Sequence, residues 1–152
     1  MVAQMSDDKH IISKKVVYTA GTWDLFHIGH LNLLKSSKEK GDFLIVGVST
    51  DELVESYKGS KPIIPLAERM AMIEACQFVD EVIIQHSLLE ISQLEKLNAD
   101  ILTIGDDWVG KYLEGIEWFK NNPSKEVVFL PYTKHISSTK IKQMIGLKHN
   151  SE

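Results

Sequence analysis

The segment GTWDLFHIGH, residues 21–30, decides the fold because it joins a strand pattern to a helix pattern. Residues 15–19 before it are β-branched and aromatic, which predicts a strand. Apolar residues at helical spacing follow over 28–40, and Gly41 stands where a helix ends. The first backbone N–H groups of a helix lack partners and attract anions. A glycine-containing turn from strand to helix therefore indicates a phosphate site.

The same alternation continues to the end of the chain. Further strands are expected at 43–48, 81–84, 101–104 and 126–130, and helices at 51–57, 66–78, 87–97, 112–120 and 138–145. Ser87 and Ser137 are candidate N-caps, and Gly146 is expected to end the last helix. Five short apolar strands separated by helices predict an α/β domain, a parallel sheet with helices on both faces. We assign it to 15–147, with a flexible lead-in at 1–14 and a tail at 148–152.

Composition narrows the classes of protein. The chain has 152 residues and a formal net charge of −4, which argues against binding to duplex nucleic acid. It has a single cysteine, which is typical of a reducing compartment. No apolar run approaches the 18 or so residues of a membrane span, and the amino terminus has no apolar signal core. We therefore expect a soluble cytoplasmic protein without a membrane or nucleic-acid partner.

Two histidines lie inside the decisive segment. His27 and His30 are three residues apart, so they project from one side of the first helical turn. Gly29 between them would let a phosphate approach the backbone. A structural role fits the bare pair equally well, and a metal site fits less well because no Cys, Asp or Glu completes the ligand set. The position directly after a strand favours phosphate chemistry.

Two other strand ends carry unusual residues. Residues 105–111, GDDWVGK, offer acids and a tryptophan that suit ribose, a base or a metal-bound triphosphate, although a solvated turn is also consistent. Residues 131–140, PYTKHISSTK, bring three hydroxyls to a helix start, more than one cap requires. These hydroxyls, with the free N–H groups of the helix, favour phosphate binding.

The cationic candidates lie between the second and third predicted strands. Lys58 and Lys61 are on a loop that can close over an anionic substrate, although loop lysines are usually solvated. Arg69 is the only arginine in the chain. Its planar fork suits a bidentate phosphate or carboxylate, and a surface acid such as Glu68 or Glu74 is the alternative partner.

At this point the sequence resembles a known family. Residues 21–30 look like the G-T-[FW]-D-x-x-H-x-G-H signature of the small cytidylyltransferases, and FVDEVI at 78–83 resembles a further family segment. Residues 105–111 resemble the G-D-D-W-x-G-K of the glycerol-3-phosphate members, and 136–141 resemble their I-S-T-T-K-I. The likeness covers 16–145, with the motifs in the family's order.

The resemblance implies a Rossmann-like homodimer that transfers CMP from CTP to an alcohol phosphate, with Mg²⁺ bound to the triphosphate and pyrophosphate released. By carry-over, the catalytic residues would be His27, His30 and Lys58. The nucleotide would contact Gly21, Thr22, Trp23, Asp24, Gly29, Asp107, Trp108, Thr133, Ser137, Ser138 and Thr139. The acceptor would contact Lys58, Arg69 and Gln77, and no metal ligand is assigned.

The departures from the family concern arginines. Gln77 stands where the family usually has an arginine, and Tyr132 replaces the arginine that opens the last motif. Glycerol 3-phosphate is the leading acceptor, with ethanolamine phosphate, choline phosphate or another polyol phosphate as alternatives. An adenylyltransferase that uses ATP and a nucleotide sensor without turnover are also consistent. HIGH also occurs in class I aminoacyl-tRNA synthetases, but a mildly acidic chain of 152 residues leaves no room for a tRNA-binding domain, so we reject that class.

Overall fold

The computed structural model describes residues 14–150, with side chains up to residue 146. The strands are β1 (Val16–Gly21), β2 (Phe43–Ser49), β3 (Glu81–Gln85), β4 (Ile101–Gly105) and β5 (Glu126–Leu130). The helices are α2 (Ile28–Glu39), α3 (Asp51–Lys58), α4 (Leu66–Glu74), α5 (Ile91–Leu97), α6 (Glu114–Lys120) and α7 (Ser138–Asn150), with a 3₁₀ turn η1 (Asp106–Trp108). Residues 1–13 of the predicted lead-in and 151–152 of the predicted tail lie outside the described residues.

All strand pairs are parallel, in the order β3-β2-β1-β4-β5, which confirms the predicted sheet. The chain reverses its direction of winding between β1 and β4, and ligands bind at such a switch point in open α/β sheets. β1 pairs with β2 along its whole length, but with β4 only at Val17 and Tyr18. The carboxyl ends of β1 and β4 therefore separate, which opens a crevice at that edge.

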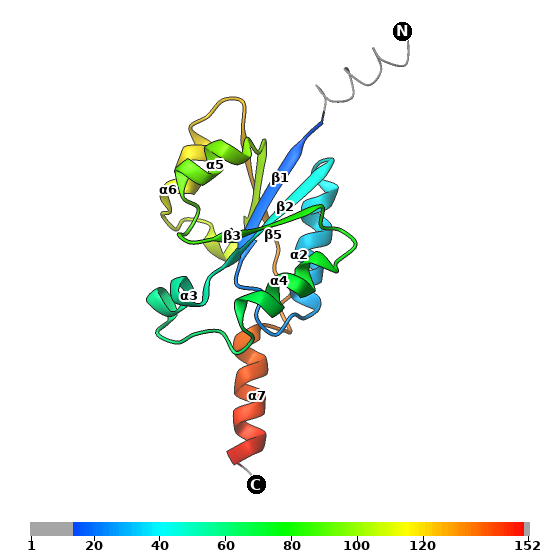
Figure 1. Cartoon of the computed structure of the whole chain (residues 1–152), viewed down its shortest axis with the longest axis vertical. Helices are drawn as coiled ribbons and strands as arrows, with labels where there is room; N and C mark the ends of the chain where they lie inside the picture. Colours follow the sequence, from blue (N-terminus) through cyan, green and yellow to red (C-terminus); the bar gives the residue numbers. More distant parts are fainter. Residues whose placement is uncertain (1–13, 151–152) are drawn as a thin grey trace.

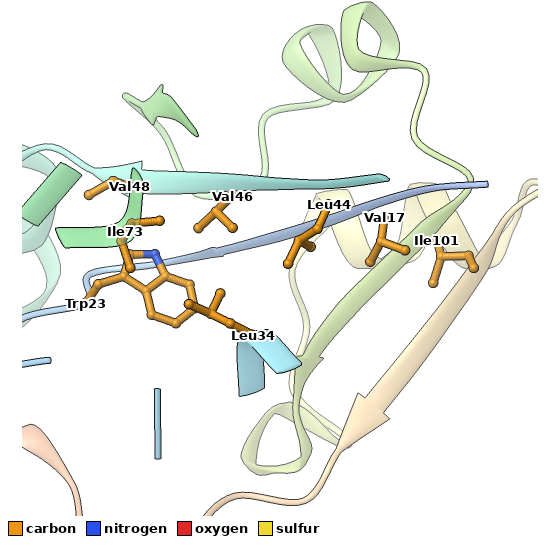
Figure 2. Packing of buried hydrophobic residues seen from close by; sticks show 8 residues of the cluster. All are labelled: Val17, Trp23, Leu34, Leu44, Val46, Val48, Ile73 and Ile101. Carbon is orange, nitrogen blue, oxygen red and sulfur yellow. The ribbon is translucent and has the colours of Figure 1, made fainter. Parts of the chain in front are cut away.

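Helices cover both faces of the sheet (Figure 1). Side chains alternate along a strand, so Val17 faces the layer of α2 and α4 while Tyr18 faces the layer of α5 and α6. Figure 2 shows the first core cluster, in which Leu34 of α2 and Ile73 of α4 approach the β1 and β2 side chains. Both cores anchor the strands whose carboxyl ends form the site. No helix of the described part is long and apolar enough to cross a membrane.

Some element boundaries differ from the prediction. α4 ends at Glu74 because residues 76–78 form a turn, and α5 begins only at Ile91. Leu89, with φ of 45°, interrupts helical geometry after Ser87, so the predicted cap at Ser87 is wrong. α7 passes through Gly146, because a helical glycine costs about 1 kcal/mol without ending the helix.

Candidate active site

The turn after β1 is strained and locked. Trp23 and Leu25 are non-glycine residues in the left-handed region, with φ of 58° and 51°. Such residues cost about 1–3 kcal/mol each and cluster at functional sites. The Trp23 indole is 3% exposed, packs in the core (Figure 2) and donates its N–H to the Gly47 carbonyl at 3.0 Å. Trp23 therefore anchors the turn and also lines a second cleft described below, and its predicted nucleotide contact stays a prediction.

The two histidines form the amino-terminal cap of α2. The Gly29 N–H donates to His27 Nδ1 at 3.0 Å, and the His27 N–H donates to His30 Nδ1 at 3.2 Å. The rings stack with centroids 3.8 Å apart. Because both Nδ1 atoms accept a hydrogen bond, the proton of each neutral ring lies on Nε2. Each imidazole therefore presents an N–H donor to a ligand.

Burial keeps this pair neutral. It lowers the pKa of His27, and it lowers the pKa of His30 to about 3, helped by the neighbouring His27 and Lys58 and opposed by Asp24. His30 is also enclosed by aromatic rings, with Trp23 at 5.4 Å and Phe26 at 5.5 Å between centroids. Neutral Nε2–H donors at a helix amino terminus suit an oxygen that gains negative charge.

A cleft of about 610 Å³ opens where β1 and β4 separate. Residues from all three predicted clusters line it, as expected for the carboxyl edge of a parallel sheet. The predicted residues along it are Gly21, Thr22, His27, Gly29, His30, Lys58, Asp107, Trp108, Thr133, Ser137, Ser138 and Thr139. The structure thus gathers the predicted catalytic residues and most of the predicted nucleotide contacts in one place.

The three hydroxyls at the start of α7 have separate tasks. Ser137 Oγ accepts the Lys140 N–H at 3.0 Å, which confirms the predicted cap. Ser138 Oγ donates to the Asp24 carbonyl at 2.7 Å and so connects α7 to the turn between β1 and α2, called here the motif turn. Thr139 is exposed and lines the cleft. Thr133 is positioned by the Asn32 amide, which donates to Thr133 Oγ1 at 2.9 Å.

A second cleft of about 590 Å³ adjoins the first. The two clefts share lining at Gly21, Thr22, His30, Lys58 and the start of α7. The second also contains Lys61 and, from α7, Lys142. His30 therefore stands between a cleft with few charges and a cleft with three lysines.

Asp24, another predicted nucleotide contact, lines the second cleft, and its carboxylate already accepts hydrogen bonds from other parts of the chain. The carboxylate is 3% exposed and accepts the N–H groups of Ile63 and Ile64 at 2.8 and 2.9 Å. Lys142 Nζ lies 3.2 Å from it. Burial alone would raise the pKa of Asp24, but these three donors together hold it below its usual value. Asp24 therefore holds the loop before α4, and its predicted nucleotide contact stays a prediction.

The two predicted acceptor residues outside the clefts are also corrected. Arg69 is 1% exposed and donates to the carbonyls of Ile64, Thr22 and Ser49 and to Asp51 at 2.5 Å. Its fork ties the loops after β1 and β2 together instead of meeting an acceptor. Gln77 lies in the exposed turn that leads into β3, at the amino-terminal edge of the sheet, opposite the cleft.

Several lining residues have no signature in the sequence. Gln85 is buried and donates from Nε2 to Ser49 Oγ at 3.0 Å, while its Oε1 accepts the Leu89 N–H. Leu88 and Leu89 line the same wall. Tyr57 OH lies 3.2 Å from Thr22 Oγ1 at the mouth. The only available signal was position, since Gln85 ends a strand at the edge where ligands bind.

A Rossmann-like sheet with paired neutral imidazoles at a helix amino terminus defines a nucleotide-binding α/β enzyme of the nucleotidyltransferase class. The profile of the cytidylyltransferase-like family matches residues 18–144, and the chain belongs to this family.

Individual relatives cover most of the chain. It is 40% identical over 133 residues to the glycerol-3-phosphate cytidylyltransferase of Bacillus subtilis strain 168, covering 87% of this chain and 98% of that protein. It is 36% identical over 137 residues to an FAD synthase of Thermococcus sibiricus, covering 87% and 91%. A lipopolysaccharide core biosynthesis protein from Thermoplasma volcanium superposes with a TM-score of 0.65 at 30% identity, covering 81% and 99%.

Proposed function

We propose that the protein transfers CMP from CTP to an alcohol phosphate, with glycerol 3-phosphate as the leading acceptor, giving CDP-glycerol and pyrophosphate. The observation that carries the proposal is the neutral His27–His30 pair capping α2 inside the cleft. The similarity to the glycerol-3-phosphate cytidylyltransferase, nearly end to end, supports the choice of substrates.

In the proposed reaction, a phosphate oxygen of the acceptor forms a bond to the α-phosphorus of CTP. The bond from that phosphorus to the oxygen bridging to the β-phosphorus breaks, and pyrophosphate leaves. A phosphate ester is already ionised near neutral pH, so no strong general base is required. The Nε2–H groups of His27 and His30 and the amino terminus of α2 stabilise charge on the transferred group. Lys58 adds a positive charge to the same region.

The nucleoside is assigned to the apolar part of the first cleft. The Trp108 ring and the side chains of Leu88 and Leu89 provide apolar surface there. Asp107 lies beside them as an exposed carboxylate. The segment from Thr133 to Thr139 also lines this cleft and is assigned to the base and triphosphate.

Magnesium would enter bound to the triphosphate. Within residues 14–146, no group of three His, Cys, Asp or Glu side chains is placed to hold a metal. Asp107 is the carboxylate along the first cleft, and Mg²⁺ typically takes one or two carboxylates plus substrate phosphates. These residues therefore fit an ion delivered with the substrate, which would neutralise charge on the phosphates.

The experiment is pyrophosphate release with Mg²⁺ and CTP across glycerol 3-phosphate, ethanolamine phosphate, choline phosphate and polyol phosphates. Each reaction is repeated with ATP, because an FAD synthase is among the relatives. Turnover with CTP and glycerol 3-phosphate supports the proposal. Turnover with ATP alone would replace it with an adenylyltransferase, and CTP binding without pyrophosphate release from any acceptor would indicate a nucleotide sensor.

We further propose that the enzyme is a cytoplasmic homodimer, the state implied by its resemblance to the small cytidylyltransferases. Ile63, in the loop before α4, is 58% exposed, and Met72, on α4, is 55% exposed. These two side chains provide apolar surface that a second copy could cover. Light scattering coupled to gel filtration tests this, and a monomer mass at micromolar concentration would contradict it.

A further inference from the structure

We propose that the second cleft binds the phosphate of the acceptor and that Lys142 of α7 is one of its ligands. This inference rests on the proposed transfer to an alcohol phosphate and assigns the acceptor a place. Lys142 lies beyond the motifs that the sequence singles out, and its position is evident only in the folded chain.

The charges of the two clefts differ. Among the described residues, the first cleft has Lys58 and Asp107, whose formal charges cancel. The second has Lys58, Lys61 and Lys142 against the single carboxylate of Asp24. The arginine that could have met an acceptor is engaged inside the fold. Lysine ammonium groups in the second cleft are therefore the cations available to a doubly charged phosphate ester.

Lys142 can leave Asp24 without removing all of the hydrogen bonds that the carboxylate accepts. Asp24 accepts two backbone N–H groups in addition to the ammonium, so its carboxylate stays hydrogen-bonded when Lys142 turns away. The Lys142 side chain is 37% exposed and keeps its freedom to reorient. An arriving phosphate replaces Asp24 as its partner.

The position also suits the chemistry. His30, Thr22 and Thr139 line both clefts, so a phosphate in the second cleft faces a nucleotide phosphate in the first across the His30 ring. Lys58 lies at the same junction. Burial lowers the pKa of Lys58, Lys142 lowers it further, and Asp24 raises it, as expected for three charges around one junction.

The test compares Lys142→Met with Lys142→Arg and with Lys35→Met, a matched change of an exposed lysine on α2 that lines neither cleft. We expect Lys142→Met to raise the KM for glycerol 3-phosphate about tenfold or more, the value of a charge-assisted hydrogen bond, while the KM for CTP stays within about twofold. Lys142→Arg should stay within about threefold of the parent, because it keeps the cation.

A purely structural Lys142 would behave differently. In that case Lys142→Met would lower the melting temperature and reduce kcat/KM for both substrates in parallel, and that result would overturn the assignment. A rise in the KM for CTP alone would also overturn it, since the cleft would then hold the β- and γ-phosphates.

Calorimetric titration of glycerol 3-phosphate, and of inorganic phosphate, into the parent and Lys142→Met proteins separates this inference from the proposed activity. Weaker binding to the variant supports the acceptor site even if CTP is not consumed. Equal binding, or no binding to the parent, rejects the site whether or not the protein turns over CTP.

Discussion

The His30 ring accepts the backbone N–H of His27 through Nδ1 at 3.2 Å and stacks on the His27 ring. The His27 N–H thus fixes the tautomer of His30, the Gly29 N–H fixes that of His27, and the stacking holds the two rings against each other. N-caps are usually Ser, Thr, Asp or Asn, whose side-chain oxygen accepts a backbone N–H of the first helical turn. A neutral imidazole accepts on one edge and donates on the other, so the same residue can cap the helix and present an N–H to a phosphoryl oxygen.

Removing either donor should slow the chemical step more than it weakens nucleotide binding. His27→Ala and His30→Ala are each expected to lower kcat about 10²–10³-fold, the usual loss of one donor to a developing oxyanion, with a smaller change in the KM for CTP. His86→Ala is the control, because His86 is exposed and lies outside both clefts. Steady-state kinetics with pyrophosphate detection measures this. Equal losses in kcat and CTP affinity would argue against a role confined to the transition state.

The neutral state of His30 should also affect how the free energy of unfolding depends on pH. Its folded pKa of about 3 lies below its ordinary value of 6.5, so the unfolded chain binds the proton first as pH falls. Stability from this group is complete above pH 6.5 and is lost between pH 6.5 and 3, by up to about 1.4 kcal/mol per pH unit. Urea unfolding at pH ~5 and ~7.5 measures the slope.

His30→Asn tests the source of that slope, because the amide oxygen can accept the His27 N–H without titrating. We expect a shallower dependence on pH over the same window, whatever the absolute stability of the variant. An unchanged slope would assign the effect to other groups.

Arg69 should matter for folding although it lies outside both clefts. Arg69→Met leaves buried carbonyl groups and Asp51 without their donor and should lower the free energy of unfolding by about 3–5 kcal/mol. Lys38→Met removes a half-exposed ion pair with Asp80 and should cost about 1 kcal/mol or less. Urea unfolding compares the two. A variant that is as stable as the parent but has a raised acceptor KM would restore the original acceptor assignment.

The sequence predicted the sheet and the three strand-end clusters because both follow from local patterns. β-branched runs marked the strands, and parallel topology alone brings residues 21–30, 105–108 and 131–139 to one edge. The neutral state of the histidines was not predictable, since it depends on the rings of Trp23 and Phe26 and on burial.

The sequence did not show in which direction several side chains point. Trp23, Asp24 and Arg69 occur in or near a phosphate-site pattern, and their side chains turn inward to hold the turn that carries the histidines. A sequence shows that an arginine is present, but not which carbonyl groups its fork will meet. Lys142 was missed for the converse reason, because its approach to Asp24 exists only once α7 crosses the motif turn.

Gly29 should be required for the position of His27 rather than for backbone freedom. A Cβ at residue 29 would lie 2.8 Å from His27 Cε1, so Gly29→Ala must displace the ring from the cap. We expect kcat to fall at least about tenfold with little loss of overall stability, because the displaced imidazole is the donor that we propose stabilises charge on the transferred group. Gly146→Ala is the matched control, since a Cβ there meets nothing within 4 Å and should stabilise α7 by about 0.5–1 kcal/mol without changing kcat. Steady-state kinetics and urea unfolding of both variants test this prediction. A fully active Gly29→Ala enzyme would mean that the imidazole tolerates displacement and is not a positioned donor.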